Sequence, residues 1–474
     1  MSTPWDTVII GSGPNGLSAG VYLAQKGLRV LILEAADSLS AGTRTQELTL
    51  PGYRHDVGSA VHPLGYLSPY FQTLGLEKHG LEWVLPPASV AHPLDGQEAV
   101  LLSKSIAETA ANLGVDAGRY QRLLAPFVGR TEELLRDALK PLGLPHSPLL
   151  LARFGLKAAL PATLFQELFF KGERARALFG GCAAHSVLPL NKLFTAAVGY
   201  LFLITAHAEN WAFPKGGAAC IADALAACFA AAGGEIQFST RINHWRDLPP
   251  ARTYLFDTDP RQLVNIAGEQ LPAAYRRRLG NYRYGPGVFK VDYALAGPIP
   301  WRDPRCAQAS TVHLGGTFAE LARGEKAAWR GRVADKPFVL LCQQSLFDPT
   351  RAPAGHHTGW AYCHVPFDST QDMTAVIDRQ IERFAPGFRD LVLARHTMNT
   401  QDLYAYNPNY LGGAITGGSV DITQLFTRPV ARFNPYSTPN PNVFICSAAT
   451  PPGAGVHGMC GYHAARGVAK RLGK

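Results

Sequence analysis

Residues 11–16 have the glycine spacing of a phosphate-binding turn, Gly-x-Gly-x-x-Gly. Gly11 allows a tight reversal of the chain, Gly13 lets a pyrophosphate approach the backbone, and Gly16 lets a following helix pack closely on a strand. The backbone amides at the start of that helix would face the phosphate oxygens. The chemistry indicated is therefore the binding of a dinucleotide.

Glu34 is the second residue with a chemical role at a defined distance. It lies about twenty residues after the glycines, at the end of the apolar run Leu28–Leu33. A carboxylate at this place accepts hydrogen bonds from ribose hydroxyls. The same negative charge disfavours a 2′-phosphate, so NADP is not expected here.

These residues need a strand, a helix and a second strand to hold them. Val8–Ile10 is a β-branched run typical of a buried strand, and Leu17, Val21 and Leu23 follow at helical spacing. The run before Glu34 supplies the second strand. The pattern predicts a βαβ unit and an α/β fold.

A second glycine-rich stretch lies close to the end of the sequence, between Pro451 and Ala465: "PPGAGVHGMCGYHAA". The apolar run Val443–Cys446 predicts a strand before it, and a helix is expected from about Tyr462. So much bare backbone indicates that something bulky lies against this loop.

Several further segments carry a family resemblance. They read "AADSLSAGTRTQELTLPGYRHDVGS" after Glu34, "FPKGGAACIADALAACFAAAGGEIQFSTRI" from Phe213, "YLFDTDPRQL" from Tyr254, and "DPTRAPAGHHTGWAYCHVP", "QIERFAPGF" and "NPNYLGGAITGG" later in the chain. Together with the two glycine-rich stretches they resemble the flavin amine oxidase and phytoene desaturase superfamily, and most closely its phytoene dehydrogenase-related branch. The family pair of glycines is Ala41-Gly42 here, and its triple glycine is Gly453-Ala454-Gly455.

The resemblance implies FAD as cofactor, held by a Rossmann-like domain of the glutathione reductase type. In relatives the C-terminal loop lies under the flavin ring, which would explain Gly453, Gly455, Gly458 and Gly461. The implied cofactor-binding residues are Gly11, Gly13, Pro14, Asn15, Gly16, Glu34, Ala35, Gly42, Thr43, Arg44, Gly58, Ser59, Arg241, Ile242, Asp257, Thr258, Gly455, Val456, His457, Gly458 and Met459. Arg44 is the candidate for paired hydrogen bonds to the pyrophosphate, and Arg241 and Ile242 for backbone contact with the adenine.

The FAD-binding segments are separated in the sequence. The FAD domain is expected in residues 1–65, 213–262 and 401–474, and an interleaved α+β substrate or cap domain in residues 66–212 and 263–400. The segment Gly287–Trp301 alternates partly at period two and is expected in the sheet of that second domain.

The resemblance implies hydride transfer between a lipophilic substrate, isoprenoid or acyl in type, and flavin N5, as a desaturase, saturase or isomerase. A flavin amine oxidase and a non-catalytic FAD-binding interaction protein are the alternatives. His457 and His313 are the candidate catalytic residues. The superfamily's amine oxidases often use a lysine–water bridge to N5, but the sequence does not identify that lysine. No Cys-x-x-Cys is present, so the expected electron acceptor is oxygen or a quinone.

Composition and motifs limit the classes of binding partner that are expected. The net charge is +9, but no zinc-finger spacing, RNP-type string or long basic run accompanies it, so nucleic acid is not expected. Eight cysteines without close pairs fit reduced thiols in a cytoplasmic protein, and no metal site is predicted. Residues 148–180 are rich in Leu and Phe beside basic residues, which fits either two core-facing helices or peripheral contact with an anionic membrane. The oligomeric state is left open.

Overall fold

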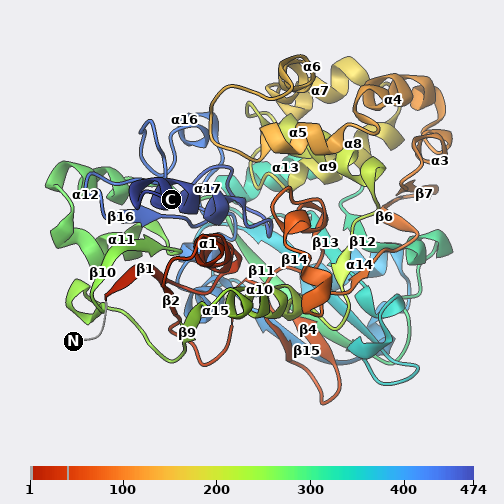
Figure 1. The fold of residues 1–474 in the computed structure, drawn as a ribbon. Coiled ribbons are helices and arrows are strands. Elements are labelled where there is room, and N and C mark those ends of the chain that lie inside the picture. The colour runs from red at the N-terminus through yellow and green to blue at the C-terminus, as the bar shows by residue number, and fades with distance from the viewer. Residues whose placement is uncertain (1–3, 40–41) are drawn as a thin grey trace.

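The computed structural model describes residues 4–39 and 42–474 (Figure 1). Its first sheet is parallel and has the strand order β16–β10–β1–β2–β9. The strands are β1 (Trp5–Ile10), β2 (Val30–Leu33), β9 (Glu235–Gln237), β10 (Ala251–Phe256) and β16 (Val443–Ile445). This is the order of a Rossmann-like sheet, so the predicted α/β fold is confirmed.

Helices cover both faces of this sheet because its strands are apolar on both sides. Ile32 of β2 packs in one core with α1 (Pro14–Gln25), α10 (Ala219–Ala231) and α17 (Met459–Arg471). Leu31 and Leu33 point the other way and pack with α11 (Pro260–Ala267) and α12 (Ala273–Gly280). Runs buried on both faces are typical of parallel sheets. The predicted strand–helix–strand unit at the N-terminus is confirmed, and α17 begins three residues before the predicted start.

The second sheet is larger and mostly antiparallel, with the order β15–β11–β14–β13–β12–β6–β7. Only β12 and β6 run parallel to each other among these pairs. The strands are β6 (Ala88–Leu94), β7 (Gln97–Leu102), β11 (Gly287–Leu295), β12 (Ala309–Leu314), β13 (Val339–Cys342), β14 (His357–Val365) and β15 (Val392–Met398). The predicted strand from Gly287 is therefore β11, next to the edge strand β15.

Helices gather over the other part of the molecule as a cap (Figure 1). They are α3 (Ile106–Ala111), α4 (Ala117–Leu124), α5 (Thr131–Ala138), α6 (Pro148–Ala158), α7 (Ala162–Phe169), α8 (Glu173–Ala184) and α9 (Thr195–Ala208). Three helices form over residues 148–184, where two were predicted. Pro161 separates α6 from α7 because it cannot continue the backbone hydrogen bonds of a helix.

The remaining elements are short or peripheral. Two ribbons pair β3 (Thr45–Glu47) with β4 (Arg54–Asp56) and β5 (Trp83–Val84) with β8 (Phe213–Pro214). The other helices are α2 (Pro63–Tyr66), α13 (Phe318–Trp329), α14 (Thr374–Phe384), α15 (Thr400–Tyr406) and α16 (Ile422–Leu425).

Two groups of residues outside the segments predicted for the FAD domain pack with the parallel sheet. Helices α11 and α12 share a core with the parallel sheet, so that unit extends beyond residue 262. Tyr70, Phe71 and Leu76 share the core of α1 and α17 and join the same unit. Because these contacts join segments far apart in the sequence, they cannot be predicted from hydrophobic periodicity.

No single helix within the described residues is long and apolar enough to cross a membrane. Helices α6 and α7 reach that length and composition only as a pair, which is bent by 102° at the break between them.

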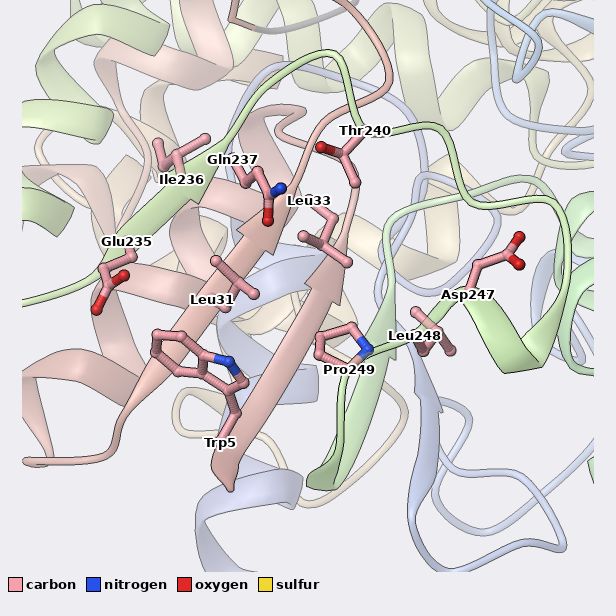
Figure 2. Close-up of a pocket in the computed structure, with 10 residues that line it drawn as sticks. All are labelled: Trp5, Leu31, Leu33, Glu235, Ile236, Gln237, Thr240, Asp247, Leu248 and Pro249. Atoms are coloured by element: carbon pink, nitrogen blue, oxygen red, sulfur yellow. The ribbon is translucent and has the colours of Figure 1, made fainter. Parts of the chain in front are cut away.

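A hollow of about 590 Å³ lies beside β2 and β9 (Figure 2). Leu31 and Leu33 line it, together with Trp5 and the segment from Asp247 to Pro249 that leads into β10. It lies on the face of the sheet that carries α11 and α12, and it shares no lining residue with the cavity described next.

Candidate functional site

One cavity of about 520 Å³ lies where the two sheets and the cap meet. At one end it is lined by the start of α1 and by glycines of three loops. At the other end it is lined by α9 and by strands β11, β13 and β14. Its surface is mostly apolar side chains with a few polar groups, which is typical of a small-molecule site.

The glycine-rich turn between β1 and α1 forms the first end. Gly11 has φ +100°, a conformation that favours glycine. A Cβ on Gly16 would lie 2.2 Å from the Gly11 carbonyl oxygen, so only glycine permits this turn. Gly13, Pro14 and Asn15 line the cavity. The structure thus shows a tight turn at Gly11 and a close backbone approach at Gly16, and the contact of Gly13 with a pyrophosphate stays a prediction.

Asp257 closes this turn from the end of β10. Its Oδ2 accepts a hydrogen bond of 2.9 Å from the Gly16 amide, and a Cβ on Gly13 would lie 2.4 Å from the same oxygen. Burial raises the pKa of Asp257 to about 7, and Glu34 adds to this rise while the Gly16 amide opposes it. A buried carboxyl group without a cation partner therefore stands at the phosphate-binding turn.

Glu34 lies at the end of β2, as predicted, and is nearly fully buried. Its carboxylate accepts from the Ser12 amide at 2.8 Å, the Ser12 hydroxyl at 2.7 Å and the Ala36 amide at 2.9 Å. The acid is thus held next to the glycine turn, on an element separate from it, which is the arrangement expected for contact with a ribose. Ala35 follows it on the same loop.

The loops around Gly42 and Gly58 form the next part of the cavity wall. A Cβ on Gly58 would lie 2.3 Å from the Gly42 carbonyl oxygen, and Ser59 donates to that oxygen through its amide and its hydroxyl, both at 3.0 Å. Gly42, Gly58 and Ser59 all line the cavity. Ala41 lies outside the described residues, so the geometry of that departure from the family pattern is not described.

Thr43 is buried and Arg44 is partly buried, but neither lines the cavity. The Arg44 guanidinium stacks over Tyr406 at 5.3 Å from the ring centroid, and its Nε donates to the Leu39 carbonyl at 3.1 Å. The structure therefore does not place Arg44 against the predicted pyrophosphate end, and that role stays a prediction.

The C-terminal loop contributes Ala454, Gly455 and Val456 to the cavity. The next two glycines serve a different contact. A Cβ on Gly458 would lie 2.2 Å from the Ser18 hydroxyl, and one on Gly461 would lie 1.9 Å from the Asn15 carbonyl. Because α17 packs on α1, a side chain at Gly458 or Gly461 would collide with α1. A side chain at Gly453 would instead meet the Arg428 guanidinium. Of the four glycines attributed to the flavin ring, only Gly455 lines the cavity.

His457 and Met459 are not among the lining residues of the cavity. The His457 ring is fully buried, and its Nδ1 accepts a hydrogen bond of 3.1 Å from the Met459 amide at the start of α17. Burial lowers the pKa of His457 to about 4, so the ring is neutral at pH 7. The His457 side chain thus pairs with a backbone amide at the start of α17.

His313, the other candidate catalytic residue, lies on β12 and is fully buried outside the lining. Its Nε2 is 2.9 Å from Nε2 of His185, which does line the cavity. The structure does not bring His313 and His457 together. Three predicted cofactor residues also stand apart from the lining: Arg241 is exposed, and Ile242 and Thr258 are buried.

Lys290 is a residue that the sequence reasoning did not find. It is a buried lysine on β11 whose side chain lines the cavity and forms an ion pair with Asp292. Burial lowers the pKa of Lys290, and the Asp292 carboxylate opposes that change. His55 Nδ1 lies 3.7 Å from one carboxylate oxygen of Asp292, and His396 Nδ1 lies 3.5 Å from the other. The cavity thus contains one lysine ammonium with a buried counter-ion.

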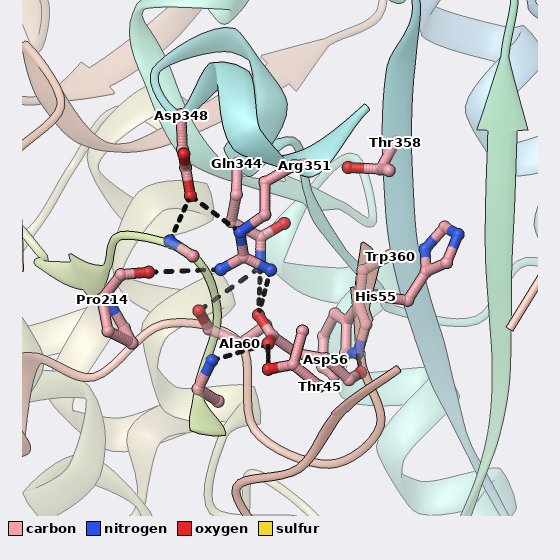
Figure 3. A network of polar contacts seen from close by, with 12 residues as sticks. Thr45, His55, Asp56, Ala60, Pro214, Gln344, Asp348, Arg351, Thr358 and Trp360 are labelled. Carbon is pink, nitrogen blue, oxygen red and sulfur yellow. Dashed lines mark hydrogen bonds and ion pairs between the residues drawn. The ribbon is translucent and has the colours of Figure 1, made fainter. Parts of the chain in front are cut away.

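A second buried ion cluster lies behind the same loops (Figure 3). Arg351 pairs with Asp56 at 3.0 Å and with Asp348 at 2.9 Å, and all three side chains are buried. Gln344 also donates to Asp56. The Trp360 indole of the cavity wall donates to the Asp56 carbonyl at 2.8 Å. This cluster fixes the loop before Gly58 against β14 and thereby positions the glycine wall.

The glycine-lined end fits the dinucleotide that the sequence predicts. Two polar atoms of its lining, Asn15 Oδ1 and His62 Nδ1, are buried without a hydrogen-bond partner among the described residues. The backbone is bare at Gly13, Gly42, Gly58 and Gly455, and α1 presents its N-terminus with no acidic residue in its first turn. A helix N-terminus suits an anionic phosphate, and here the Asp257 carboxyl already accepts from one of its amides, that of Gly16.

Known proteins resemble this chain over most of its length. A sequence-family model described as an NAD(P)-binding Rossmann-like domain matches residues 9–74. Pyridine nucleotide-disulfide oxidoreductase domain-containing protein 2 of Rattus norvegicus is 26% identical, over 99% of this chain and 94% of its own length. The phytoene desaturase (neurosporene-forming) of Cereibacter sphaeroides is 24% identical, over 96% and 92%.

The predicted resemblance to the phytoene desaturase-related flavoproteins is confirmed. The solved structure of cyclohexylamine oxidase from Brevibacterium oxydans has the same fold, with a TM-score of 0.61, 17% identity and complete coverage of both chains. The interleaving of a Rossmann-like domain with a second sheet is therefore shared with amine oxidases of known structure.

Proposed function

We propose that this protein is an FAD-dependent oxidoreductase that transfers hydride between flavin and a lipophilic substrate of isoprenoid or acyl type. The oxidoreductase class and the FAD cofactor are supported by the desaturase relatives and by the amine oxidase fold. The substrate class rests on the apolar cavity.

One observation supports this proposal above the others: the glycine-lined end and the apolar end belong to one cavity. Gly13 and Gly455 line it together with Leu201, Phe202 and Leu340. A cofactor lying along the glycines would therefore have one side facing an apolar space of the same cavity. When bound, FAD would supply hydride acceptance at N5.

The chain's own residues bind and orient the substrate and exclude water. The leucine and phenylalanine side chains of α9 that line the cavity would contact the apolar carbons of the substrate. Strands β11 and β14 provide the opposite wall. In a desaturation one hydrogen leaves as hydride and the neighbouring one as a proton. Lys290, when neutral, can accept that proton, and the resulting ammonium remains paired with Asp292. The electrons leave to oxygen or a quinone.

Anaerobic mixing tests the proposal. Purified yellow protein is mixed with lipophilic polyenes or acyl compounds, and flavin absorbance is followed without oxygen. Loss of the yellow colour is expected with one of these compounds. A flavin that no such compound bleaches, but whose removal abolishes binding of a protein partner, would instead favour a non-catalytic interaction protein.

An amine oxidase is the second candidate, and Lys290 favours it. The resembled amine oxidases use a lysine–water bridge to the flavin, and Lys290 is a buried lysine in the lining of this cavity. The same anaerobic experiment with primary and secondary amines distinguishes the two candidates, because bleaching by amines alone would replace the lipophilic substrate.

We further propose that the helical cap contacts an anionic membrane. Leu144 is 94% exposed, Leu149 is 87% exposed and Leu156 is 79% exposed, with the exposed basic residue Arg153 among them. The cavity reaches Leu139, just before this surface. Exposed leucines beside basic side chains favour the interface of an anionic bilayer.

Flotation with anionic vesicles at low salt measures this contact. The wild type is expected to float with the vesicles, and the double variant Leu149→Glu/Leu156→Glu is expected to stay at the bottom. Leu393→Glu is the matched control, because Leu393 is an exposed leucine on the edge strand β15. Equal flotation of the double variant and the control would contradict this surface.

A further inference from the structure

The apolar end of the cavity contains two buried polar atoms with no partner. The Trp211 indole is 2% exposed, and its Nε1 has no hydrogen-bond partner among the described residues. Ser186 is 3% exposed, and its hydroxyl likewise has none. Both residues line the cavity. Buried polar groups are rarely left unpaired, so each of these atoms is expected to have a partner, and a water or ligand in the cavity that both residues line could supply it.

His185 lies next to both of these residues. It precedes Ser186 at the end of α8, lines the same cavity, and its ring centroid is 5.9 Å from that of Trp211. His185 Nε2 is bonded to His313 at 2.9 Å, and the ring also contacts Phe202. A small polar site is therefore built into an aromatic wall and fixed by a second buried histidine.

Charge at this site is low. Burial lowers the pKa of His185 to about 3, and burial also lowers the pKa of His313 well below its usual value. Both imidazoles are therefore neutral at pH 7. Among the described residues that line the cavity, Lys290 is the only lysine or arginine, and it is already paired with Asp292. A carboxylate placed at Trp211 would have no cation to offset its desolvation.

We infer that the lipophilic substrate carries a neutral oxygen, such as a hydroxyl, ketone or ester group, that is held by Trp211 and Ser186 at the apolar end of the cavity. This inference rests on the proposed function. The indole can only donate, so the substrate atom must accept. A plain hydrocarbon would leave the donor unpaired, and a carboxylate would be buried without a counter-ion.

A second tryptophan of the same lining provides the contrast. Trp360 lines the cavity too, but its Nε1 donates to the Asp56 carbonyl at 2.8 Å. Two tryptophans thus line one cavity. The indole N–H group of Trp360 already donates to a carbonyl, whereas that of Trp211 has no acceptor among the described residues. Replacing each by phenylalanine removes the same chemical group, but only Trp211→Phe removes a donor available to a ligand.

Four C15 probes of one skeleton test the inference on FAD-loaded protein: farnesene, farnesol, farnesoate and farnesylamine. Apparent Kd values come from saturation of the flavin difference spectrum or, where the flavin bleaches, of the bleaching rate. Farnesol is expected to bind about tenfold more tightly than farnesene, the ratio typical of one buried hydrogen bond. Trp211→Phe and Ser186→Ala should each reduce this ratio toward one, while Trp360→Phe should leave it unchanged.

The outcomes separate this inference from the proposed function. Equal binding of farnesene and farnesol, or a ratio unchanged by Trp211→Phe, would overturn the neutral oxygen while leaving the oxidoreductase intact. Tightest binding of farnesoate would overturn the claim that the group is uncharged. Tightest binding of farnesylamine would overturn it in favour of the amine oxidase. Protein that takes up no flavin would refute the proposed function itself.

Discussion

Two buried ion clusters lie on the two sides of strand β4 and differ in how completely their charges are paired. Asp56 accepts from Thr45, Ala218, Arg351 and Gln344, so both of its carboxylate oxygens are used. The neighbouring His55 faces Asp292, which pairs with Lys290. There, Asp292 Oδ1 and Nδ1 of both His55 and His396 have no hydrogen-bond partner among the described residues.

The difference matches the positions of the two clusters. The Arg351 cluster contributes no residue to the cavity lining, whereas Lys290 lines the cavity. A fully hydrogen-bonded buried network makes a structure rigid, whereas an unpaired buried polar atom is costly unless a water or a ligand pairs with it. We therefore interpret the Arg351 cluster as structural support and the Lys290 cluster as part of the chemistry.

Arg351→Met should have the largest effect. It would leave Asp56 and Asp348 buried without their cation, which typically costs about 3–5 kcal/mol of stability. A large drop in the thermal unfolding temperature and loss of bound flavin are expected, measured by circular dichroism and absorbance. Arg136→Met is the control, because both side chains of the Arg136–Glu132 pair on α5 are exposed and the pair should contribute about 1 kcal/mol or less. Similar losses of thermal stability in the two variants would contradict the structural role of the Arg351 cluster.

Asp257→Asn examines a further buried aspartate, one that has no cation partner among the described residues. Because its pKa is raised to about 7, the folded protein binds a proton that the unfolded chain releases near pH 4. Stability should therefore fall as pH rises from 4 to 7, by up to about 1.4 kcal/mol per pH unit. The asparagine keeps an acceptor for the Gly16 amide and cannot ionise.

Denaturant unfolding of the two proteins at pH 5 and pH 7.5 measures this difference. Asp257→Asn should gain stability relative to the wild type as pH rises, and the FAD affinity of the wild type should fall with pH more steeply than that of the variant. Parallel curves for the two proteins would mean that Asp257 does not titrate in this range.

The double variant Lys290→Met/Asp292→Asn should slow chemistry while the fold survives, because it removes the buried Asp292 charge together with its cation. Proton transfer by a positioned side chain typically contributes a factor of about 10²–10⁴, so flavin reduction by substrate is expected to slow at least about 100-fold. Bound FAD should be retained, because Lys290 lies on β11, apart from the glycine-lined loops. Stopped-flow absorbance measures the rate. A variant that loses its flavin, as Arg351→Met is expected to, would place Lys290 with the structural cluster.

The sequence predicted the dinucleotide end well because its signals are local. The glycines at 11–16, Glu34 and the last strand and helix each lie within one short segment with a recognisable pattern. Even there, the reason for Gly458 and Gly461 depended on α17 packing against α1, a contact between opposite ends of the chain.

Lys290, Trp211 and Ser186 could not be predicted in the same way. A single lysine in a strand has no local signature, and Lys290 reaches the cavity because β11 pairs with β14, opposite Tyr362. Trp211 and His185 meet through the packing of separate segments of the chain. The signal available in the sequence was the presence of one lysine in the apolar strand beginning at Gly287.

His396→Ala is expected to have the smallest effect and tests whether the Lys290 cluster responds to protons. Burial raises the pKa of Asp292, but Lys290 and His396 outweigh that effect and hold the pKa below its usual value. A depressed carboxyl pKa stabilises the fold above the unfolded-state pKa, and this contribution is lost as pH falls through the folded-state pKa. Without His396 the folded-state pKa rises, so acid unfolding should begin at a higher pH, by less than about one unit.

Acid titration followed by circular dichroism measures that midpoint, with His79→Ala as control because His79 lies in the short helix Leu76–His79, away from Asp292. The His396 ring is 34% exposed on the edge strand, so its removal leaves no buried cavity comparable to that of a core residue. An unchanged midpoint would show that the distance of 3.5 Å between His396 and Asp292 carries no electrostatic coupling. His396 would then be no part of the electrostatics of the Lys290 cluster.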